Sequence, residues 1–448
     1  MEKKRYERPT LRKMNTGLMN KFGTKTENEP LTHIESVAVK GLLKEYGSPL
    51  FVLSERQIRR NIRNASRIFN TRYPKVQFAW SYKTNYMDAV CRTFHQEGSW
   101  AEVVSGFEYD KALNNGVPGH QIIFNGPDKT DEQLVLAARN NSLIHIDHYD
   151  ELYSLIRLSN EHKLNPKVAI RVNMDTGIYP KWDRFGFNFE NGQAWNALTR
   201  IVSSERLELV GLHCHIGTFM LSPNAYATAA RNLCELAWSV KERYGKMVHY
   251  LDLGGGFPST NTLKGAYLPG TDTVPSLDQF ADAITDVILG YGFRPEELPL
   301  LILETGRALI DDAGYLLGTV LATKRLSDGR RATILDFGIN SLFTSFWYEH
   351  KVSPAQPLGQ QTEETVLYGP LCMNIDVVRE SIVMPLLEKG NQVVVHQVGA
   401  YNMTQWMQFI TLRPAIVLID EENKTHLIRK AETTEYINSQ ELLPTHLN

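Results

Sequence analysis

The strongest constraint on the fold is a regular alternation of short apolar runs with segments of helical periodicity. In the segment Ser276–Ile288, for example, Ser276 can cap a helix, and Phe280, Ala281 and Ile284 fall on one apolar stripe. Eight runs of strand character recur along the chain: Val76–Trp80, Ala101–Val104, Ile122–Phe124, Leu143–Ile146, Val168–Val172, Leu209–His213, Val248–Leu253 and Pro299–Leu303. Eight strands alternating with helices predict a (β/α)8 TIM barrel. A doubly wound sheet is the alternative, but the even spacing favours closure.

The pattern changes beyond residue 312, where predicted strands follow one another without helices between most of them. This change indicates a C-terminal, mainly-β domain, to which an early strand ending at Leu53 would add. We therefore predict a polar N-terminal arm at 1–30, strands contributed to the β-domain at 31–53, the barrel at 54–312 and the β-domain at 313–448.

The composition excludes several classes of protein. A length of 448 residues predicts two domains, and 42% hydrophobic with 22% charged residues is typical of a globular protein. A net charge of −2 gives no reason to expect a nucleic-acid or membrane partner. The charged first residues lack the apolar core of a secretory signal. The four cysteines show no CxxC spacing, so we expect a cytoplasmic enzyme without a disulfide framework.

A lysine follows the first predicted barrel strand. In such barrels the carboxyl ends of the strands carry the chemistry, and a desolvated amine at this edge is a candidate nucleophile. Lys83 occupies this position, although most lysines are solvated surface charges. The two histidines His213 and His215 follow another strand, but a histidine at a strand end is more often packed or hydrogen-bonded than a metal ligand, so we expect no metal site.

Two further motifs close the last barrel strands. Gly254-Gly255-Gly256 could bring backbone N–H groups close to a phosphate, or it could simply form a tight turn. Glu304-Thr-Gly-Arg307 offers a carboxylate for a protonated ring nitrogen and a guanidinium for a phosphate, or it forms an internal ion pair.

Taken together, the order and spacing of these motifs are similar to those of a known family. From about residue 47 to residue 430 the chain resembles the fold-type III pyridoxal-phosphate (PLP) decarboxylases, which include diaminopimelate, ornithine and arginine/lysine decarboxylases. The resemblance rests on six motifs: Ser81-Tyr-Lys83, His213-Cys-His215-Ile-Gly-Thr218, Gly254-Gly-Gly-Phe, Glu304-Thr-Gly-Arg307, Gly369-Pro-Leu-Cys372 and Gly399-Ala-Tyr401. It implies a TIM barrel followed by an alanine-racemase-like, mainly-β domain.

The resemblance also implies roles for the residues that bind the cofactor. Lys83 would hold PLP covalently, His215 would stack on the pyridine ring, and Glu304 would keep the ring nitrogen protonated. The phosphate would be bound by residues at the barrel rim together with one tyrosine of the β-domain: Thr218, Gly255, Gly256, Arg307 and Tyr401.

Three more residues complete the implied site. Arg171 and Glu102 match inner-barrel positions that support the ring and its link to the lysine. Cys372 would reach the site from the other subunit of a homodimer and return a proton after carbon dioxide leaves. The reaction implied is decarboxylation of an amino acid to an amine, as in lysine-type or polyamine metabolism.

Two departures from the family pattern concern the substrate. The segment after Asp336-Phe-Gly has no arginine to read a distal carboxylate, and Tyr348-Glu349-His350 is closer to the Tyr-Asp-His of ornithine-type enzymes. Met373 stands where an acidic residue usually faces the distal amine, although Asp376 is retained. The predicted substrate-binding residues are therefore Tyr348, Glu349, Met373 and Asp376, and the substrate could be a modified or carrier-bound amino acid.

Two alternatives share the same fold. Amino-acid racemases also have a PLP lysine, but they pair the ring nitrogen with arginine and lack the Gly-Pro-x-Cys segment. A non-catalytic PLP-binding homologue would have no need to keep Lys83, Glu304 and Cys372 together.

Overall fold

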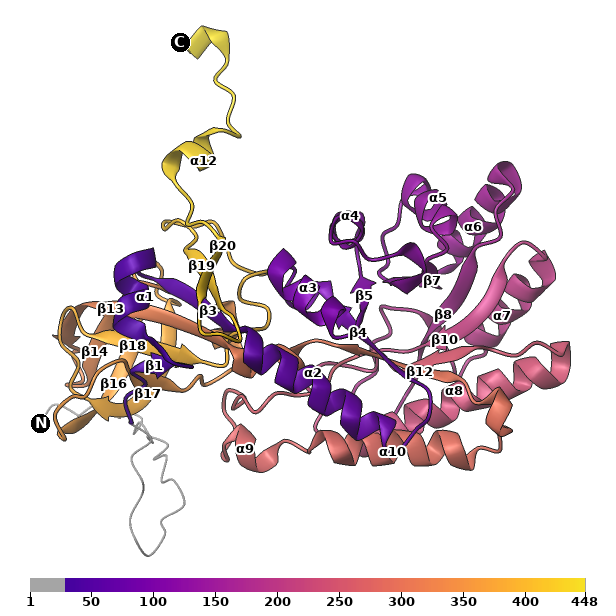
Figure 1. Ribbon diagram of the computed structural model, residues 1–448, viewed down its shortest axis with the longest axis horizontal. Coiled ribbons are helices and arrows are strands. Elements are labelled where there is room, and N and C mark those ends of the chain that lie inside the picture. The colour runs from indigo at the N-terminus through magenta and orange to yellow at the C-terminus, as the bar shows by residue number, and fades with distance from the viewer. Residues whose placement is uncertain (1–28, 448) are drawn as a thin grey trace, which may run out of the picture.

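The computed structural model describes residues 29–447. Apart from Glu29 and Pro30, the predicted polar arm at 1–30 lies outside the described residues. Figure 1 shows two bodies side by side, a barrel of strands surrounded by helices and a second, mainly-β domain.

Eight parallel strands form the closed barrel, because β12 pairs with β4 and β8 pairs with β10. Each predicted run corresponds to one of them: β4 (Val76–Ser81), β5 (Trp100–Val103), β6 (Ile122–Phe124), β7 (Leu143–Ile146), β8 (Lys167–Asn173), β10 (Glu208–His213), β11 (Tyr250–Asp252) and β12 (Leu300–Thr305). A two-residue strand, β9 (Phe187–Asn188), pairs with the end of β8. The prediction of a TIM barrel is confirmed.

Helices cover the outside of the barrel. The longer ones are α2 (Glu55–Asn70), α3 (Asp88–Gln96), α4 (Gly106–Asn114), α5 (Asp131–Arg139), α6 (Tyr149–His162), α7 (Gln193–Ser204), α8 (Pro223–Tyr244) and α10 (Leu277–Gly290), with short turns at α9 (Gly270–Thr273) and α11 (Arg307–Ile310). Local signals set their starts: Ser54 accepts a hydrogen bond from the Gln57 N–H at α2, and Ser276 caps α10 in a capping box with Gln279. Among the described residues, no helix has the length and apolar character needed to span a membrane.

The second domain is a mixed sheet. Its strands are β3 (Leu50–Ser54), β13 (Gly314–Arg325), β14 (Arg331–Leu335), β15 (Val352–Pro354), β16 (Thr362–Tyr368), β17 (Val377–Pro385), β18 (Gln392–His396), β19 (Ala415–Ile419) and β20 (Thr425–Arg429). The early strand β3 lies between β13 and β19, antiparallel to the first and parallel to the second. We propose the domain limits 31–53, 54–312 and 313–448, which these pairings support.

Smaller elements lie at the ends of the described chain. The hairpin of β1 (His33–Ile34) and β2 (Val37–Ala38) leads into α1 (Val39–Tyr46), which packs on the β-domain core. Near the C-terminus, α12 (Thr434–Asn438) stands away from the body of the molecule (Figure 1).

Candidate active site

A layer of polar side chains closes the carboxyl end of the barrel interior. Successive side chains of a strand alternate between its two faces, so a residue two positions beyond an inward-facing one also faces inward. The apolar interior cluster includes Ala79, Ile123, Leu143, Ala169, Tyr250 and Ile302, with Trp100 packed against it. Two positions further along each strand stand polar residues, in chain order Ser81, Glu102, Asn125, His145, Arg171, Asp252 and Glu304. On β10 a register shift at Gly211 brings His213 into the same layer.

Lys83 projects from the 3-10 turn Tyr82–Thr84 directly after β4. Its amine donates to Glu102 Oε2 at 2.5 Å, and that carboxylate is fully buried while the Lys83 side chain is 35% exposed. Asn125 Nδ2 bridges Glu102 and Glu304, at 3.0 and 2.5 Å. Burial opposes the charge on the amine, but the Glu102 and Glu304 carboxylates outweigh it and raise the pKa of Lys83.

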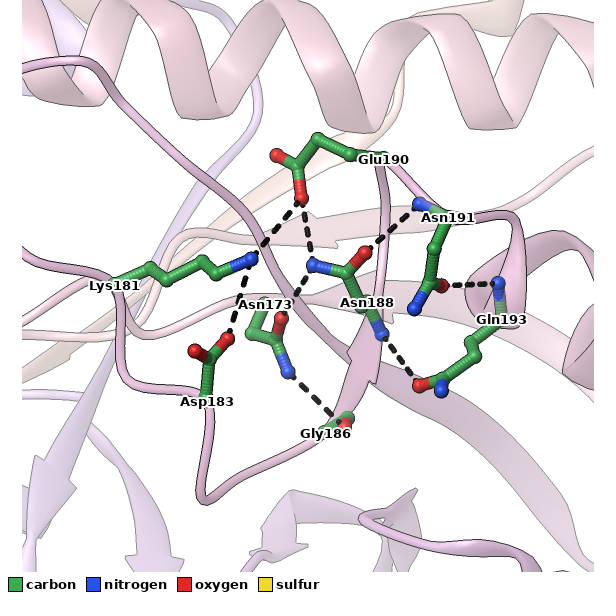
Figure 2. A pocket seen from close by; sticks show the side chains of 8 residues that line it. All are labelled: Asn173, Lys181, Asp183, Gly186, Asn188, Glu190, Asn191 and Gln193. Atoms are coloured by element: carbon green, nitrogen blue, oxygen red, sulfur yellow. Dashed lines mark hydrogen bonds and ion pairs between the residues drawn. The ribbon is translucent and has the colours of Figure 1, made fainter.

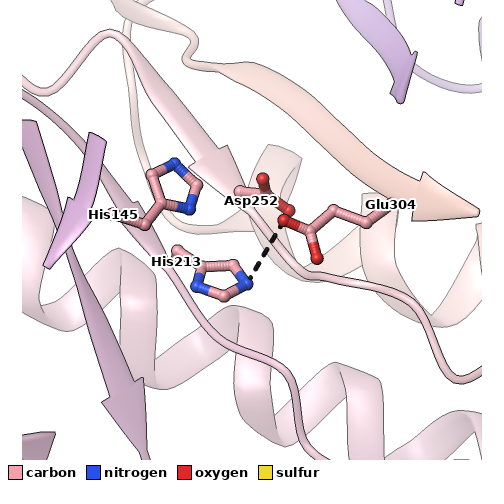
Figure 3. Close-up of side chains that lie close together, drawn as sticks. All are labelled: His145, His213, Asp252 and Glu304. Carbon is pink, nitrogen blue, oxygen red and sulfur yellow. Dashed lines mark ion pairs between the residues drawn. The ribbon is translucent and has the colours of Figure 1, made fainter. Parts of the chain in front are cut away.

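Glu304 belongs to a buried cluster with two histidines and an aspartate, drawn in Figure 3. One candidate ligand atom from each of His145, His213, Asp252 and Glu304 lies within 4.8 Å of the others. His213 Nε2 is 3.5 Å from Glu304 Oε1, and His145 Nε2 is 2.9 Å from the Tyr250 hydroxyl. Burial holds the pKa of both histidines well below the usual range, so the rings are neutral. The sequence prediction included no metal at this position.

The glycine loop after β11 lies against the ends of β10 and β12. A Cβ on Gly255 would lie 2.2 Å from the Glu304 carbonyl oxygen, and one on Gly256 would lie 2.3 Å from the Gly217 carbonyl oxygen. The Gly255 N–H donates to His215 Nδ1 at 3.0 Å, which fixes the tautomer of that ring. Burial, followed by the charges of Arg171 and Lys83, keeps the pKa of His215 well below its usual range. A neutral, oriented ring suits the predicted stacking role.

Arg307 forms a cationic centre at the rim, 7% exposed and surrounded by polar and aromatic groups. It donates to the Thr218 hydroxyl at 3.2 Å and makes a short hydrogen bond to the Tyr348 hydroxyl. The guanidinium carbon also lies 4.7 Å from the centre of the Tyr401 ring. Three of the predicted phosphate residues are therefore brought together, and Tyr348 joins them.

Arg171, at the end of β8, lies among aromatic side chains. Its guanidinium carbon is 4.4 Å from the Phe185 ring, and the Trp182 ring is 5.5 Å from the His215 ring. These side chains line a small pocket at the end of β8. Asp147, 3.9 Å away, partners the arginine charge.

Of the predicted substrate residues, Tyr348 lies against Arg307, and among the described residues none of the four makes a hydrogen bond or ion pair with the Lys83 amine. Cys372 is exposed, and among the described residues no hydrogen bond or ion pair joins it or Met373 to the barrel. Glu349 Oε2 is 3.7 Å from the Arg379 guanidinium. Asp376 is 2% exposed and accepts hydrogen bonds from the Ile339 and Leu371 N–H groups, so it holds the loop that carries Cys372. Its contact with substrate stays a prediction.

A second, larger cleft of about 420 Å³ lies beyond β8 (Figure 2). Its lining is polar, but the groups satisfy one another. Asn188 Nδ2 donates to Glu190 at 2.6 Å and to Asn173 Oδ1 at 3.0 Å, while Lys181 lies 3.3 Å from Asp183. None of the predicted site residues lines this cleft, and its chemistry does not demand a ligand.

The residues at the barrel mouth fit PLP. Lys83 supplies the amine, Glu304 a buried carboxylate with no lysine or arginine ion-pair partner among the described residues, and Arg307 with Thr218 an anion-binding corner. The glycine loop permits no Cβ at Gly255 or Gly256 and so leaves the backbone close to this corner.

Four residues of the site escaped the sequence analysis as contributors. His145 and Asp252 stand at the last inward position of their strands and Asn125 directly follows β6, and the alternation of faces from each apolar run would have located them. The role of His213 in the same layer was missed because the bulge on β10 reverses the facing expected from simple alternation.

Comparisons with known proteins agree with this geometry. Residues 56–311, more than half of the chain, match the model of the pyridoxal-dependent decarboxylase family, pyridoxal binding domain. Diaminopimelate decarboxylase of Bacillus subtilis is 28% identical over 93% of this chain and 96% of its own. That of Methanocaldococcus jannaschii is 29% identical over 91% of this chain and 94% of its own.

Solved structures extend the likeness to the whole fold. Diaminopimelate decarboxylase from M. jannaschii superposes with a TM-score of 0.85 at 28% identity, covering 93% of this chain and 97% of that one. A lysine/ornithine decarboxylase from Vibrio vulnificus, at 23% identity and a TM-score of 0.72 over 86% of this chain and 98% of that one, shares the fold. The barrel, the β-domain and the family match thus lead to one conclusion: this chain belongs to the pyridoxal-dependent decarboxylases, amino-acid decarboxylases that use pyridoxal phosphate.

Proposed function

We propose that Lys83 is the lysine that holds the cofactor and that the polar layer of the barrel is its active site. The observation that carries this proposal is the position of the Lys83 amine, 2.5 Å from Glu102 and bridged through Asn125 to Glu304. When bound, PLP supplies a ring that accepts the electron pair released as carbon dioxide leaves.

The chain's own residues would divide the remaining work. Glu304 holds a proton at the pyridine nitrogen, and Arg307 with Thr218 and Tyr401 binds the phosphate. Neutral His215 packs on the ring face, its orientation fixed by the Gly255 N–H. The remaining predicted supports are Glu102, Arg171, Gly255 and Gly256.

We further propose a homodimer in which Cys372 of one subunit enters the site of the other. The thiol is exposed on the loop between β16 and β17, whereas Cys91, Cys214 and Cys234 are buried. An exposed thiol held on a loop braced by Asp376 suits a proton donor that meets its site only in the assembly.

The residues near the far end of the substrate bear on its chemical class. The M. jannaschii relative has been solved with L-lysine, but here Glu349 already has a cationic neighbour in Arg379, and Met373 offers no charge. We propose an amino acid whose distal group is modified or carrier-bound, with Tyr348, Glu349, Met373 and Asp376 near it.

Carbon dioxide release tests both the proposed decarboxylation and the proposed modified substrate. Purified protein with PLP is assayed with ornithine, lysine, arginine, meso-diaminopimelate and amino acids modified at the distal end. High efficiency with one unmodified substrate contradicts the modified-substrate proposal. Racemisation without carbon dioxide would contradict decarboxylation itself.

The Lys83→Ala variant tests the cofactor link. We expect it to lose the visible absorption band of lysine-bound PLP and nearly all activity, because no other amine of the polar layer is in place to replace Lys83. Arg139→Ala, a change on the outer helix α5, serves as a control and should retain the band. An unchanged band in Lys83→Ala would overturn the assignment.

A further inference from the structure

Asp252 and Glu304 form a pair of buried carboxyl groups at the floor of the site (Figure 3). Asp252 is fully buried and Glu304 is 4% exposed. Asp252 Oδ1 accepts the Gly254 N–H at 2.8 Å, while Asp252 Oδ2 has no hydrogen-bond partner among the described residues. One buried oxygen of Asp252 is therefore free to carry a proton.

The positive charges nearby are already partnered. The Lys83 amine lies against Glu102, and the Arg171 guanidinium lies 3.9 Å from Asp147. Among the described residues, no lysine or arginine lies within ion-pair distance of Asp252 or Glu304. Two adjacent buried carboxylates without a cation cannot both stay ionised, because each charge opposes the other in a medium that screens poorly.

The other titratable groups around the pair do not supply the missing charge. They come from four further strands and from β11 itself: Glu102 on β5, His145 on β7, Arg171 on β8, His213 on β10 and Tyr250 on β11. Burial keeps both histidines neutral by holding their pKa values low, and it raises the pKa of Tyr250. Neither nitrogen of His213 has a hydrogen-bond partner among the described residues, and with both rings neutral the cluster has no internal cation.

We propose that Asp252 and Glu304 share one proton, held on Asp252 Oδ2 and directed at Glu304, so that the single negative charge of the pair stays on Glu304. Asp252 is then a positioning residue that acts through Glu304. This inference rests on the proposed function, in which Glu304 faces the pyridine nitrogen. Burial, followed by the nearby charge of Glu304, raises the pKa of Asp252 well above its usual range, which agrees with the proposal.

A bound divalent cation is the competing explanation for the same four residues, since two imidazoles and two carboxylates are common metal ligands. A cation would require both carboxyl groups to be ionised, and it would compete with the pyridine nitrogen for Glu304. Metal analysis of the purified protein separates the two: one equivalent of zinc or another divalent metal, retained on dialysis, would overturn the shared proton.

Infrared spectroscopy tests the proton directly in the full chain without cofactor. The protein carries carbonyl-labelled aspartate, and the spectrum of the D252N variant is subtracted from that of the wild type at neutral pH. We expect a band of a protonated carboxylic acid that shifts when D2O replaces water. A difference spectrum with carboxylate bands alone would place the proton elsewhere and overturn the proposal.

A pair of variants then tests the positioning role in the PLP-loaded enzyme. D252N keeps a donor toward Glu304 and an acceptor for the Gly254 N–H, whereas D252A removes both. A hydrogen bond to a charged group makes a difference of about tenfold or more, so kcat of D252N should exceed that of D252A by about that factor. The pH at which the absorption band of bound PLP changes should move further in D252A than in D252N.

The outcomes distinguish a failure of the shared proton or of the positioning role of Asp252 from a failure of the proposed function. Equal loss in D252N and D252A, with both variants folded by circular dichroism, overturns the positioning role. The infrared result needs no bound PLP, so it can fail while the wild type still decarboxylates. If the wild type fails to bind PLP, the proposed function fails and the infrared result still stands.

Discussion

At the scale of single residues, the Lys83 amine is governed by the charges around it. Glu102 is fully buried and has no arginine or other lysine as a partner among the described residues, so it favours the protonated amine. A protonated amine cannot attack the cofactor aldehyde, so Glu102 opposes reaction until the proton moves away. The same contact gives Glu102 a means of receiving that proton.

Replacing Glu102 with glutamine should therefore lower the pKa of Lys83, which the two carboxylates raise in the wild type. An amine reacts only when deprotonated, so the pH profile of Lys83 labelling in the cofactor-free protein should move to lower pH by about one unit or more. Labelling by a small aldehyde with borohydride, read by mass spectrometry of the Lys83 peptide, measures this shift.

Glu97→Gln is the matched control, since Glu97 pairs with Arg59 and Arg63 on the protein surface and not with Lys83. Its profile should coincide with that of the wild type. A Glu102→Gln profile that stays in place would show that the Glu102 charge does not control the amine.

Sequence motifs located some residues of the polar layer and not others. Lys83, Glu304 and Arg307 were predicted because the carboxyl edge of a barrel is a known place for chemistry. His145 and Asp252 lie within apolar strands and resemble tolerated polar residues until the closed barrel brings them within 4.8 Å of His213 and Glu304. Alternation can place both side chains inside the barrel, but only closure of the barrel brings them to His213 and Glu304.

At the scale of elements, the barrel strands and helix starts could be predicted because they depend on residues that are close together in the sequence. The eight barrel strands are apolar over their length because both faces are buried, so they stood out from their surroundings. The strands β15 and β17 carry weaker sequence signals: the first has three residues, and the second mixes buried and exposed positions. Their pairing is set by the surrounding β-domain.

The N-cap of α10 offers a test at this scale. The Ser276 hydroxyl accepts a hydrogen bond from the Gln279 N–H at 3.3 Å, and Gln279 Oε1 accepts one from the Ser276 N–H at 2.9 Å. Ser276→Ala should lower the free energy of unfolding by about 1 kcal/mol, because it leaves a helix N–H without its partner. Urea unfolding at a fixed protein concentration measures the change.

Ser222 provides the comparison, since it precedes α8 but makes no side-chain cap hydrogen bond. Ser222→Ala should change the free energy of unfolding by less than about 0.5 kcal/mol. Equal losses in the two variants would mean that the capping bond of Ser276 is not the source of the effect.

At the scale of the whole molecule, the residues proposed to act in the reaction are divided between the barrel and the β-domain of each chain. Lys83 and Arg307 belong to the barrel, while Cys372 is exposed on the β-domain. The two bodies are joined through β3, which lies between β13 and β19, and through Tyr401, whose N–H donates to the Thr84 carbonyl oxygen at 2.9 Å. This junction fixes the β-domain to its own barrel, and in the proposed homodimer the Cys372 loop would meet the second copy.

Mixing two inactive variants tests that arrangement. In a dimer of a Lys83→Ala chain and a Cys372→Ala chain, one site has both defects and the other has neither. Free exchange of subunits gives half mixed dimers, each with one intact site, so about a quarter of wild-type activity should return. Lys83→Ala mixed with Arg307→Ala is the control: both residues lie on the barrel, every site keeps one defect, and no activity should return. If exchange is confirmed by mass spectrometry and the Lys83→Ala/Cys372→Ala mixture stays inactive, Cys372 does not act across the dimer.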